Sequence, residues 1–339
     1  MNLRRNVDLK LNGLTHRLRR VPVMLLMPHS RCNCRCIMCD IWKANRDGKS
    51  LTESDIMALL RDFRRLQVEW VVLSGGEALM HANLWTLCAA LKTLSVRITL
   101  LSTGLLLARH AGDIVKYCDD VIVSLDGSAA VHDRIRDVPH AFEQLKTGVA
   151  ALRGARANYP VSARCVVQRM NFEDLPNIVE AAKSLRLDHI SFLCADVSST
   201  AFNRPDGWPQ ERAAQVALTP DEVKRFAAIV EETIARCGAD FASGFIVETP
   251  EKLRKLVAYF RAVNGEADFP RVRCNAPWVS TVIEADGTVR PCFFHAPLGN
   301  IRKGGIEDIL NSDQAIAFRS QLDVRRDPIC RSCVCTLNM

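Results

Sequence analysis

Short runs of β-branched and aliphatic residues recur along the chain up to about residue 194 and alternate with stretches whose apolar residues repeat at helical spacing. The runs predict strands at 21–27, 70–75, 96–102, 120–126, 161–168 and 189–194. The amphipathic stretches predict helices at 53–66, 83–94, 141–154 and 174–185. Strands that alternate with helices pair in parallel through right-handed crossovers. The pattern therefore indicates an α/β fold, either a β/α barrel or an open doubly wound sheet, with its functional site at the carboxyl ends of the strands.

The hydrophobic pattern changes after about residue 200. A polar loop at 201–211 precedes the segment LTPDEVKRF, in which Thr219 as N-cap and Pro220 in the first turn mark the start of a helix. Two strand-like runs in 280–294 flank Asp286–Gly287, which predicts a hairpin with a type I′ turn. These changes predict four regions, namely a basic lead-in at 1–20, the sheet or barrel core at 21–218, a helical linker at 219–271 and a small domain at 272–339.

The composition, 48% hydrophobic and 24% charged over 339 residues, is typical of a globular protein with a large core. No apolar run approaches the roughly 18–20 residues that cross a membrane. The apolar part of the basic N-terminus, VPVMLLM, continues without a signal-peptide cleavage site, so we expect a cytoplasmic protein with no membrane partner. The net charge of +7 comes from dispersed basic residues that do not interleave with aromatic ones, and we therefore expect no nucleic-acid partner.

The chain has fourteen cysteines, and disulfides are rare in a reducing compartment, so the thiols point to metal or redox chemistry. Five of them stand singly in apolar stretches and are interpreted mostly as small core residues: Cys88, Cys118, Cys165, Cys194 and Cys237. Four more lie in the run RCNCRCIMC at 31–39, directly after the first predicted strand. Thiolates at such short spacings hold iron–sulfur clusters. A structural zinc site would need two separated pairs, and the nearest second CxxC, at 330–333, lies almost a whole chain away.

The run contains CxxxCxxC through Cys32, Cys36 and Cys39, and this spacing resembles the cluster motif of the radical S-adenosylmethionine (radical SAM) superfamily. The resemblance implies that these three cysteines ligate a catalytic [4Fe-4S] cluster whose fourth iron is open to S-adenosylmethionine (SAM). It also places the backbone of Met38 near the adenine, although the family usually has an aromatic residue there. Cys34 replaces an ordinary residue of the family motif, and we expect it to be dispensable.

Other segments resemble the same family in the same order. Gly75, Gly76 and Glu77 after the second strand resemble its GGE motif, in which glycines admit a ligand close to the backbone and the carboxylate holds the SAM ammonium. Ala78 takes the place of the usual proline. The resemblance assigns further cofactor contacts to Ser102 and Thr103 after strand 3, to Ser124, Asp126 and Arg136 in VSLDGSAAVHDRIRDVP, and to Leu193 in strand 6. Arg136 suits the SAM carboxylate because a guanidinium can donate two parallel hydrogen bonds to it. Arg164 and Gln168, which point to the barrel interior or its rim, are weaker candidates for the site.

The tail resembles a second iron–sulfur module. Its pattern C-x12-G-x4-C, from Cys274 through Gly287 to Cys292, resembles the start of the SPASM/twitch extension, and the chain closes with CRSCVC. This implies one auxiliary [4Fe-4S] cluster, most simply on Cys274, Cys292, Cys330 and Cys333, with Cys335 as a substitute or a spare. A zinc knuckle on the same thiolates is the alternative.

Together these resemblances imply a partial (β/α)6 barrel of the radical SAM type followed by a small SPASM/twitch-like domain. The expected activity is reductive cleavage of SAM to a 5′-deoxyadenosyl radical that abstracts hydrogen from a small polar substrate. The alternatives are a peptide-modifying maturase and a non-catalytic iron–sulfur or zinc scaffold. We expect a flavodoxin or ferredoxin as electron donor. Arg204, Asp206 and Trp208 could contact a substrate, but a surface loop is the simpler interpretation of 201–211.

Overall fold

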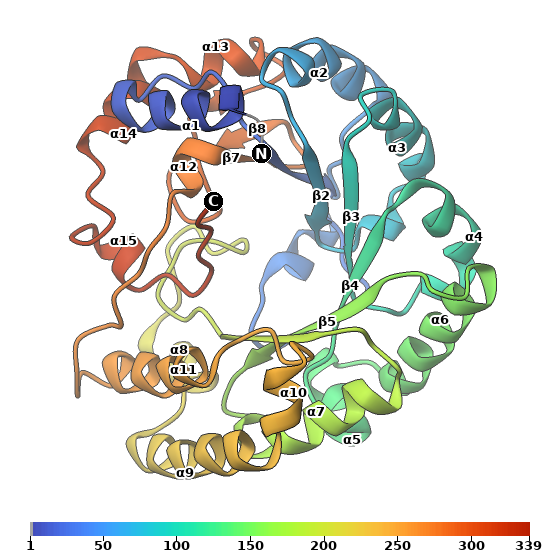
Figure 1. Cartoon of the computed structure of the whole chain (residues 1–339), viewed down its shortest axis with the longest axis vertical. Helices are drawn as coiled ribbons and strands as arrows, with labels where there is room; N and C mark the ends of the chain where they lie inside the picture. The colour runs from blue at the N-terminus through green and yellow to red at the C-terminus, as the bar shows by residue number, and fades with distance from the viewer. Residues whose placement is uncertain (1–2) are drawn as a thin grey trace.

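The computed structural model describes residues 3–339 and contains a curved sheet with helices on its outer face (Figure 1). Within these residues the strand order is β6-β5-β4-β3-β2-β1-β7-β8-β9, and neighbouring strands from β6 to β7 run parallel. The α/β class is confirmed, and the curvature selects the partial barrel over the flat open sheet. The first six strands are β1 (Val23–His29), β2 (Trp70–Gly75), β3 (Arg97–Ser102), β4 (Asp120–Ser124), β5 (Val161–Val167) and β6 (Ile190–Cys194).

The outer helices follow the strands in alternation, as the hydrophobic pattern predicts. The alternation along each strand separates two faces: Met24 and Leu26 on β1 are buried under the helices, whereas Leu25 faces the barrel interior. The helices of this part are α2 (Glu53–Arg65), α3 (Leu84–Lys92), α4 (Leu107–Tyr117), α5 (Ala129–Arg136), α6 (Ala141–Ala155) and α7 (Leu175–Ser184). The basic lead-in, for which the sequence predicts no element, contains α1 (Leu3–Thr15).

The segment after β6 is helical. Thr219 accepts a hydrogen bond from the backbone N–H of Glu222 and Pro220 occupies the first turn, so the predicted helix start is confirmed. The helices of this segment are α8 (Gln210–Ala214), α9 (Pro220–Arg236), α10 (Gly238–Ala242) and α11 (Pro250–Val263). α9 and α11 lie side by side at the bottom of the view in Figure 1. Phe226 of α9 and Phe260 of α11 meet edge to face between them.

The C-terminal region continues the barrel sheet instead of standing apart from it. Val23 to Leu26 of β1 pair in parallel with Ser280 to Ile283, which form β7. Two short strands follow, β8 (Thr288–Arg290) and β9 (Gly299–Asn300), both antiparallel to their neighbours. The helices of this region are α12 (Ala276–Val279), α13 (Ile306–Leu310), α14 (Asp313–Gln321) and α15 (Pro328–Arg331).

The hairpin between β7 and β8 has a different turn from the predicted one. A type I′ turn needs positive φ at both central residues, but only Gly287 of the Asp286–Gly287 pair has it, at 85°. The Gly287 N–H donates to the Glu284 carbonyl at 2.8 Å, which closes a four-residue turn with the glycine as its last, left-handed residue. Asp286 keeps an ordinary φ, and its carboxylate accepts from the backbone N–H of Thr288 and pairs with Lys49.

Candidate functional site

The cysteine run forms a loop between β1 and the 3-10 helix η1 (Ile41–Asn45), at the carboxyl ends of the barrel strands. The Asn45 amide pins its start, since it accepts from the Cys32 N–H at 2.9 Å and donates to the Cys32 carbonyl at 3.0 Å. The Arg35 N–H donates to the Arg136 carbonyl at 3.1 Å, which ties the loop to α5. The thiols of this loop are free, and Cys34 and Cys36 are buried. The predicted site therefore lies where a barrel places its chemistry.

Hydrogen bonding from Cys34 favours thiolate at two of the three predicted ligands, Cys32 and Cys36. The Cys34 thiol hydrogen-bonds Cys36 and Arg136 lies beside it, so the pKa of Cys36 falls to about 7 despite burial. The hydrogen bond from Cys34 also lowers the pKa of Cys32, and both bonds together with burial raise that of Cys34. Burial raises the pKa of Cys39 to about 12, although the Ile41 N–H donates to its sulfur at 3.5 Å. Cys34 thus lies beside two predicted ligands, and its single S–H can donate to one acceptor at a time, either a neighbouring sulfur or Asn33 Oδ1 at 3.8 Å.

The strand-4 segment brings Asp126 and Arg136 together under the cysteine loop. Their side chains form an ion pair in which Asp126 is fully buried, and Arg136 Nη1 lies 3.6 Å from the Cys36 sulfur. Asp126 also accepts from the Val166 N–H at 2.8 Å, which fixes the carboxylate against β5. Ser124, at the end of β4, is half-buried and opposite Arg164 in the strand register. Arg136 is thus held as a fixed cation next to the thiols.

The glycine–glutamate segment supports the loop from the side of β2. A Cβ on Gly76 would lie 2.1 Å from the Arg31 carbonyl oxygen, so only glycine permits this approach to the start of the cysteine loop. The Glu77 carboxylate is fully buried and accepts from the backbone N–H and the hydroxyl of Thr103, both at 2.7 Å. Ser102 donates to it as well. Glu77 therefore fastens the ends of β2 and β3 together, and its contact with a SAM ammonium stays a prediction.

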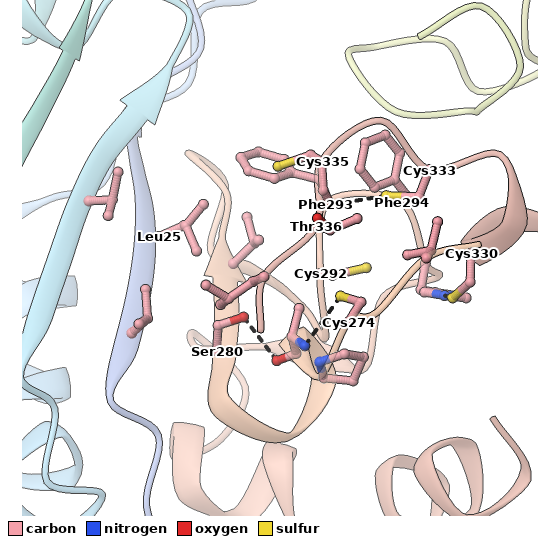
Figure 2. A pocket seen from close by; sticks show the side chains of 18 of the residues that line it. Leu25, Cys274, Ser280, Cys292, Phe293, Phe294, Cys330, Cys333, Cys335 and Thr336 are labelled. Carbon is pink, nitrogen blue, oxygen red and sulfur yellow. Dashed lines mark hydrogen bonds between the residues drawn. The ribbon is translucent and has the colours of Figure 1, made fainter. Parts of the chain in front are cut away.

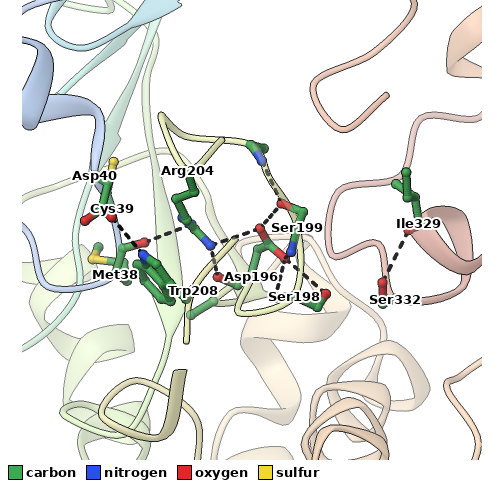
Figure 3. A network of polar contacts seen from close by, with 12 residues as sticks. Met38, Cys39, Asp40, Asp196, Ser198, Ser199, Arg204, Trp208, Ile329 and Ser332 are labelled. Atoms are coloured by element: carbon green, nitrogen blue, oxygen red, sulfur yellow. Dashed lines mark hydrogen bonds and ion pairs between the residues drawn. The ribbon is translucent and has the colours of Figure 1, made fainter. Parts of the chain in front are cut away.

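A segment from the 201–211 loop covers the far side of the cysteine loop (Figure 3). Arg204, only 2% exposed, donates to the carbonyls of Asp196 at 2.9 Å and Met38 at 3.4 Å. Its guanidinium stacks 3.9 Å above the Trp208 ring, and Trp208 Nε1 donates to Asp40 at 2.8 Å. The surface-loop interpretation is thus wrong for Arg204, because its charge is buried against the cysteine loop.

Several buried polar atoms around the loop have no hydrogen-bond partner in the described part of the chain. They are Asn33 Nδ2, Asp40 Oδ1, Arg136 Nε, both amide atoms of Gln168, and Arg204 Nε. Buried polar groups of this kind normally have partners, and the carboxylate, ammonium, hydroxyl and adenine groups of SAM could supply them. Three thiols on one short loop beside a fixed cation also fit an iron–sulfur cluster with one open iron. The residues present therefore fit both groups, and Cys32, Cys36 and Cys39 stay the predicted cluster ligands.

The tail thiols form a second group inside the barrel mouth (Figure 2). Cys274, Cys292, Cys330, Cys333 and Cys335 all line one cavity of about 220 Å³, together with interior side chains such as Leu25 of β1. Cys274 and Cys292 lie together at its centre, and Cys333 and Cys335 approach from the tail. This grouping of thiols fits one further cluster, as the sequence predicts.

Cys330 has a special environment within this group. Its sulfur lies 3.3 Å from His295 Nε2, and its backbone N–H donates to Asp327 at 2.9 Å. Burial lowers the pKa of His295 and raises that of Cys330. His295 and Asp327 are not among the site residues predicted from the sequence. The phrase CFFH, in which a histidine follows Cys292 by three residues, was the available signal.

Leu193 lies apart from the cysteine loop contacts described above. It is half-buried and lines a different, larger cavity between β6 and the tail. Its predicted contact with the adenine or ribose of SAM stays a prediction.

Comparison with family models gives two matches on this chain. Residues 26–182 match the model of the Radical SAM superfamily, and residues 274–334 match SPASM, an iron–sulfur cluster-binding domain. The first match contains the cysteine loop, the glycine–glutamate segment and the strand-4 segment. The second begins at Cys274 and includes Cys333.

Several curated proteins are similar to parts of the chain. Pre-heme d1 synthase of Dinoroseobacter shibae is 30% identical over 162 residues, which are 47% of this chain and 40% of that protein. The sporulation killing factor maturation protein SkfB of Bacillus subtilis is 21% identical over 284 residues, 82% of this chain and 62% of that protein. The PqqA peptide cyclase of Ruegeria pomeroyi is 27% identical over 65% of this chain and 53% of its own length. The chain thus spans about 40 to 62% of the length of these relatives.

The fold has counterparts among solved structures. Streptococcus suis SuiB bound to S-adenosylmethionine superposes with a TM-score of 0.63 at 14% identity, over 97% of this chain and 76% of SuiB. The structure of native anSMEcpe with bound AdoMet gives a TM-score of 0.66 at 15% identity, over 90% of this chain and 84% of that one. At such low identity, these likenesses establish the fold alone.

Proposed function

The chain belongs to the radical SAM superfamily and carries a SPASM iron–sulfur domain, and from this premise we propose that it is an enzyme that cleaves SAM reductively and uses the resulting radical to modify a peptide. The observation that carries the proposal is the presence in one chain of two separate thiol groups, a three-ligand loop beside Arg136 and a tail group inside the barrel mouth.

The choice of a peptide over a small polar substrate rests on the relatives. The match that covers 82% of this chain is to a maturation protein, and another, over 65%, is to a peptide cyclase. Streptococcus suis SuiB has also been solved bound to the precursor peptide SuiA, and that structure superposes over 98% of this chain. These similarities favour the peptide-modifying alternative over the small polar substrate that the sequence analysis preferred.

The described residues divide the work of such a reaction. When bound, the catalytic cluster and SAM supply the one-electron chemistry that yields methionine and a 5′-deoxyadenosyl radical, which takes a hydrogen atom from the substrate. Arg136, fixed by Asp126, offsets thiolate charge at Cys36 and offers its unpartnered Nε to a cofactor carboxylate. Arg204 and Trp208 cover the loop at Met38 and exclude water from that side.

The electron donor belongs to the same proposal. A flavodoxin or ferredoxin supplies the electron for cleavage, and the tail thiols hold a second cluster that transfers an electron or anchors the substrate end of the site. The non-catalytic scaffold remains the competing idea, since zinc on the tail thiolates would produce the same fold.

The test begins with anaerobic reconstitution of the full chain. We expect about eight iron atoms per chain, and formation of 5′-deoxyadenosine from SAM with dithionite. Co-expression with the short peptides encoded beside the gene should then change the mass of one of them, which mass spectrometry detects. Stoichiometric zinc without SAM cleavage would contradict the enzyme, and stimulation by small polar molecules but by no peptide would contradict the substrate class.

A further inference from the structure

A second cavity, larger than the one that holds the tail thiols, lies at the gap in the barrel, between β6 and the tail. It has a volume of about 650 Å³, and its walls come from β5, β6, α11, the extended segment 270–273 and the tail residues 331–336. It shares Arg164, Val272, Cys333, Cys335 and Thr336 with the cavity that holds the tail thiols. The two cavities are therefore neighbours, and the larger one reaches Cys333 and Cys335. Its volume suits a small ligand or a short extended segment, not a folded protein.

The walls of this cavity are strongly basic. Against one carboxylate, Glu248, they present six cationic side chains: Arg164, Lys252, Lys255, Arg271, Arg273 and Arg331. The whole chain has a net charge of +7, and the six cationic side chains of this cavity, less the charge of Glu248, account for most of it. Cationic walls around a concave site concentrate anions.

Few of these cations are neutralised by the protein itself. Lys252 lies 3.7 Å from Glu248, and Arg331 pairs at 2.8 Å with Asp268, which is 93% exposed. Lys255, Arg271 and Arg273 form no ion pair within 4.0 Å among residues 3–339. Glu248 also accepts from the backbone N–H of Phe192 at 2.9 Å, which holds it against β6. The cavity therefore has unpaired positive charge available for a ligand.

Arg164 connects this charge to the catalytic end of the barrel. It lies in the middle of β5, with its Nε 3.4 Å from Ser191, and opposite Ser124 in the strand register. Two residues after Ser124 comes Asp126, about 7 Å further along an extended chain, and Asp126 holds Arg136 beside Cys36. An anion bound near Arg164 would thus have the rest of its molecule close to the strand ends.

We infer that this cavity binds carboxylate groups of the substrate and so sets which part of the substrate reaches the radical centre. The inference rests on the proposed peptide-modifying function and names the recognition chemistry of its substrate. Arginine forks match carboxylates with two hydrogen bonds each. The carboxylates come either from Asp and Glu side chains or from the C-terminus of the peptide, and the experiment below separates these sources.

The experiment uses the reconstituted full-length holoenzyme with SAM. A tetraglutamate peptide with an amidated C-terminus and a neutral dye is titrated by fluorescence anisotropy, beside an amidated tetraglutamine peptide and a tetraglutamine peptide with a free C-terminus. We expect either carboxylate-bearing probe to bind at least about tenfold more tightly than the amidated tetraglutamine, and less so at about 300 mM salt than at about 50 mM. Binding of the first probe identifies side-chain carboxylates, and binding of the third identifies the terminal one.

The double variant Arg271→Glu/Arg273→Glu should lose this preference. The matched control is Arg325→Glu/Arg326→Glu, the same double charge reversal at two exposed residues outside the cavity, and it should change the affinities by less than about twofold. The inference is wrong if both variants weaken binding equally, or if no carboxylate probe is preferred by the wild type. It is also wrong if the double variant binds the probes normally but slows reduction by flavodoxin, because the cavity would then serve the electron donor.

Measurements on the wild type distinguish a failure of this inference from a failure of the proposed function. If it cleaves SAM with dithionite but shows no carboxylate preference, only the inference about the cavity fails. If it forms no 5′-deoxyadenosine, the proposed function fails whatever the anisotropy shows.

Discussion

The two thiol groups of this protein are assembled in opposite ways. The first comes from one loop of eight residues, Cys32 to Cys39, whose geometry is set by local bonds such as that between Cys39 N–H and the Cys36 carbonyl at 3.2 Å. The second draws on three segments, around 274, 292 and 330–335, which meet because β7 pairs with β1 and the tail returns to the barrel mouth. The first group therefore depends on the spacing of residues within one loop, and the second on the packing of distant segments against the barrel.

The electrostatic surroundings of the groups differ as well. Hydrogen bonding from Cys34 and the nearby Arg136 lower the pKa of Cys36 to about 7. In the tail, burial is the largest influence and raises the pKa of Cys292 to about 11. Within the loop the shift is not uniform, because burial raises the pKa of Cys39 to about 12. The two groups therefore differ in that hydrogen bonding within the loop favours thiolate at Cys36, whereas burial opposes it at Cys292.

The largest expected effect separates the two groups by function. Cys36→Ala should abolish formation of 5′-deoxyadenosine and lower the iron content from about eight to about four atoms per chain, because one of three ligands is lost. Cys292→Ala should lower the iron content equally but leave SAM cleavage measurable. Iron analysis and chromatography of the nucleoside check both. Loss of cleavage in both variants would mean that the two groups do not work independently.

The next effect concerns the fixed cation of the first group. Arg136→Met should lower the melting temperature, because it leaves Asp126 as a buried unpaired charge at a cost of about 3–5 kcal/mol. It should also weaken SAM binding at least about tenfold, because the guanidinium proposed to hold the SAM carboxylate is lost. Adding Asp126→Asn should restore much of the melting temperature without restoring SAM binding. Thermal unfolding and equilibrium binding of SAM are the measurements, and recovery of both properties in the double variant would assign Arg136 a purely structural role.

A smaller effect is expected where the 201–211 segment covers the first group. Arg204→Lys keeps the charge but cannot reach both the Asp196 and Met38 carbonyls with a fork. The KM for SAM should rise by about tenfold, while kcat falls less, because the loop at Met38 loosens. Arg254→Lys, on the exposed face of α11 and paired with Glu231, is the matched control and should leave both parameters unchanged. A change in melting temperature with an unchanged KM would contradict the positioning role.

The smallest effect is expected at Cys34, the spare thiol of the first group. It lies beside Cys32 and Cys36 and its one S–H can donate to either of them, but the three-ligand spacing does not require it. Cys34→Ala should therefore keep about eight irons per chain and more than about half of the SAM cleavage. Iron loss comparable to that of Cys36→Ala would show instead that Cys34 ligates the cluster.

Much of the fold could be predicted because its signals are local. The strands and helices of the barrel follow from alternating and helical periodicities, and the Thr219 cap from the residues next to it. The prediction of a type I′ turn at Asp286–Gly287 is wrong, because the turn type depends on the register of β7 and β8 and on the contact of Asp286 with Lys49. A dipeptide signal does not contain that register.

The sequence by itself determined the spacing of Cys32, Cys36 and Cys39 and the order of the motifs that follow them, since covalent geometry limits how far apart eight consecutive residues can lie. Among residues 3–339, no helix has the length and apolar character to span a membrane, in agreement with the hydrophobic pattern. Only the tertiary structure decided that Arg204 is buried against Met38 and that His295 meets Cys330. It also gathered basic residues that are dispersed along the chain into one cavity. These arrangements join residues more than thirty positions apart, and packing of the whole chain, not local preference, brings such residues together.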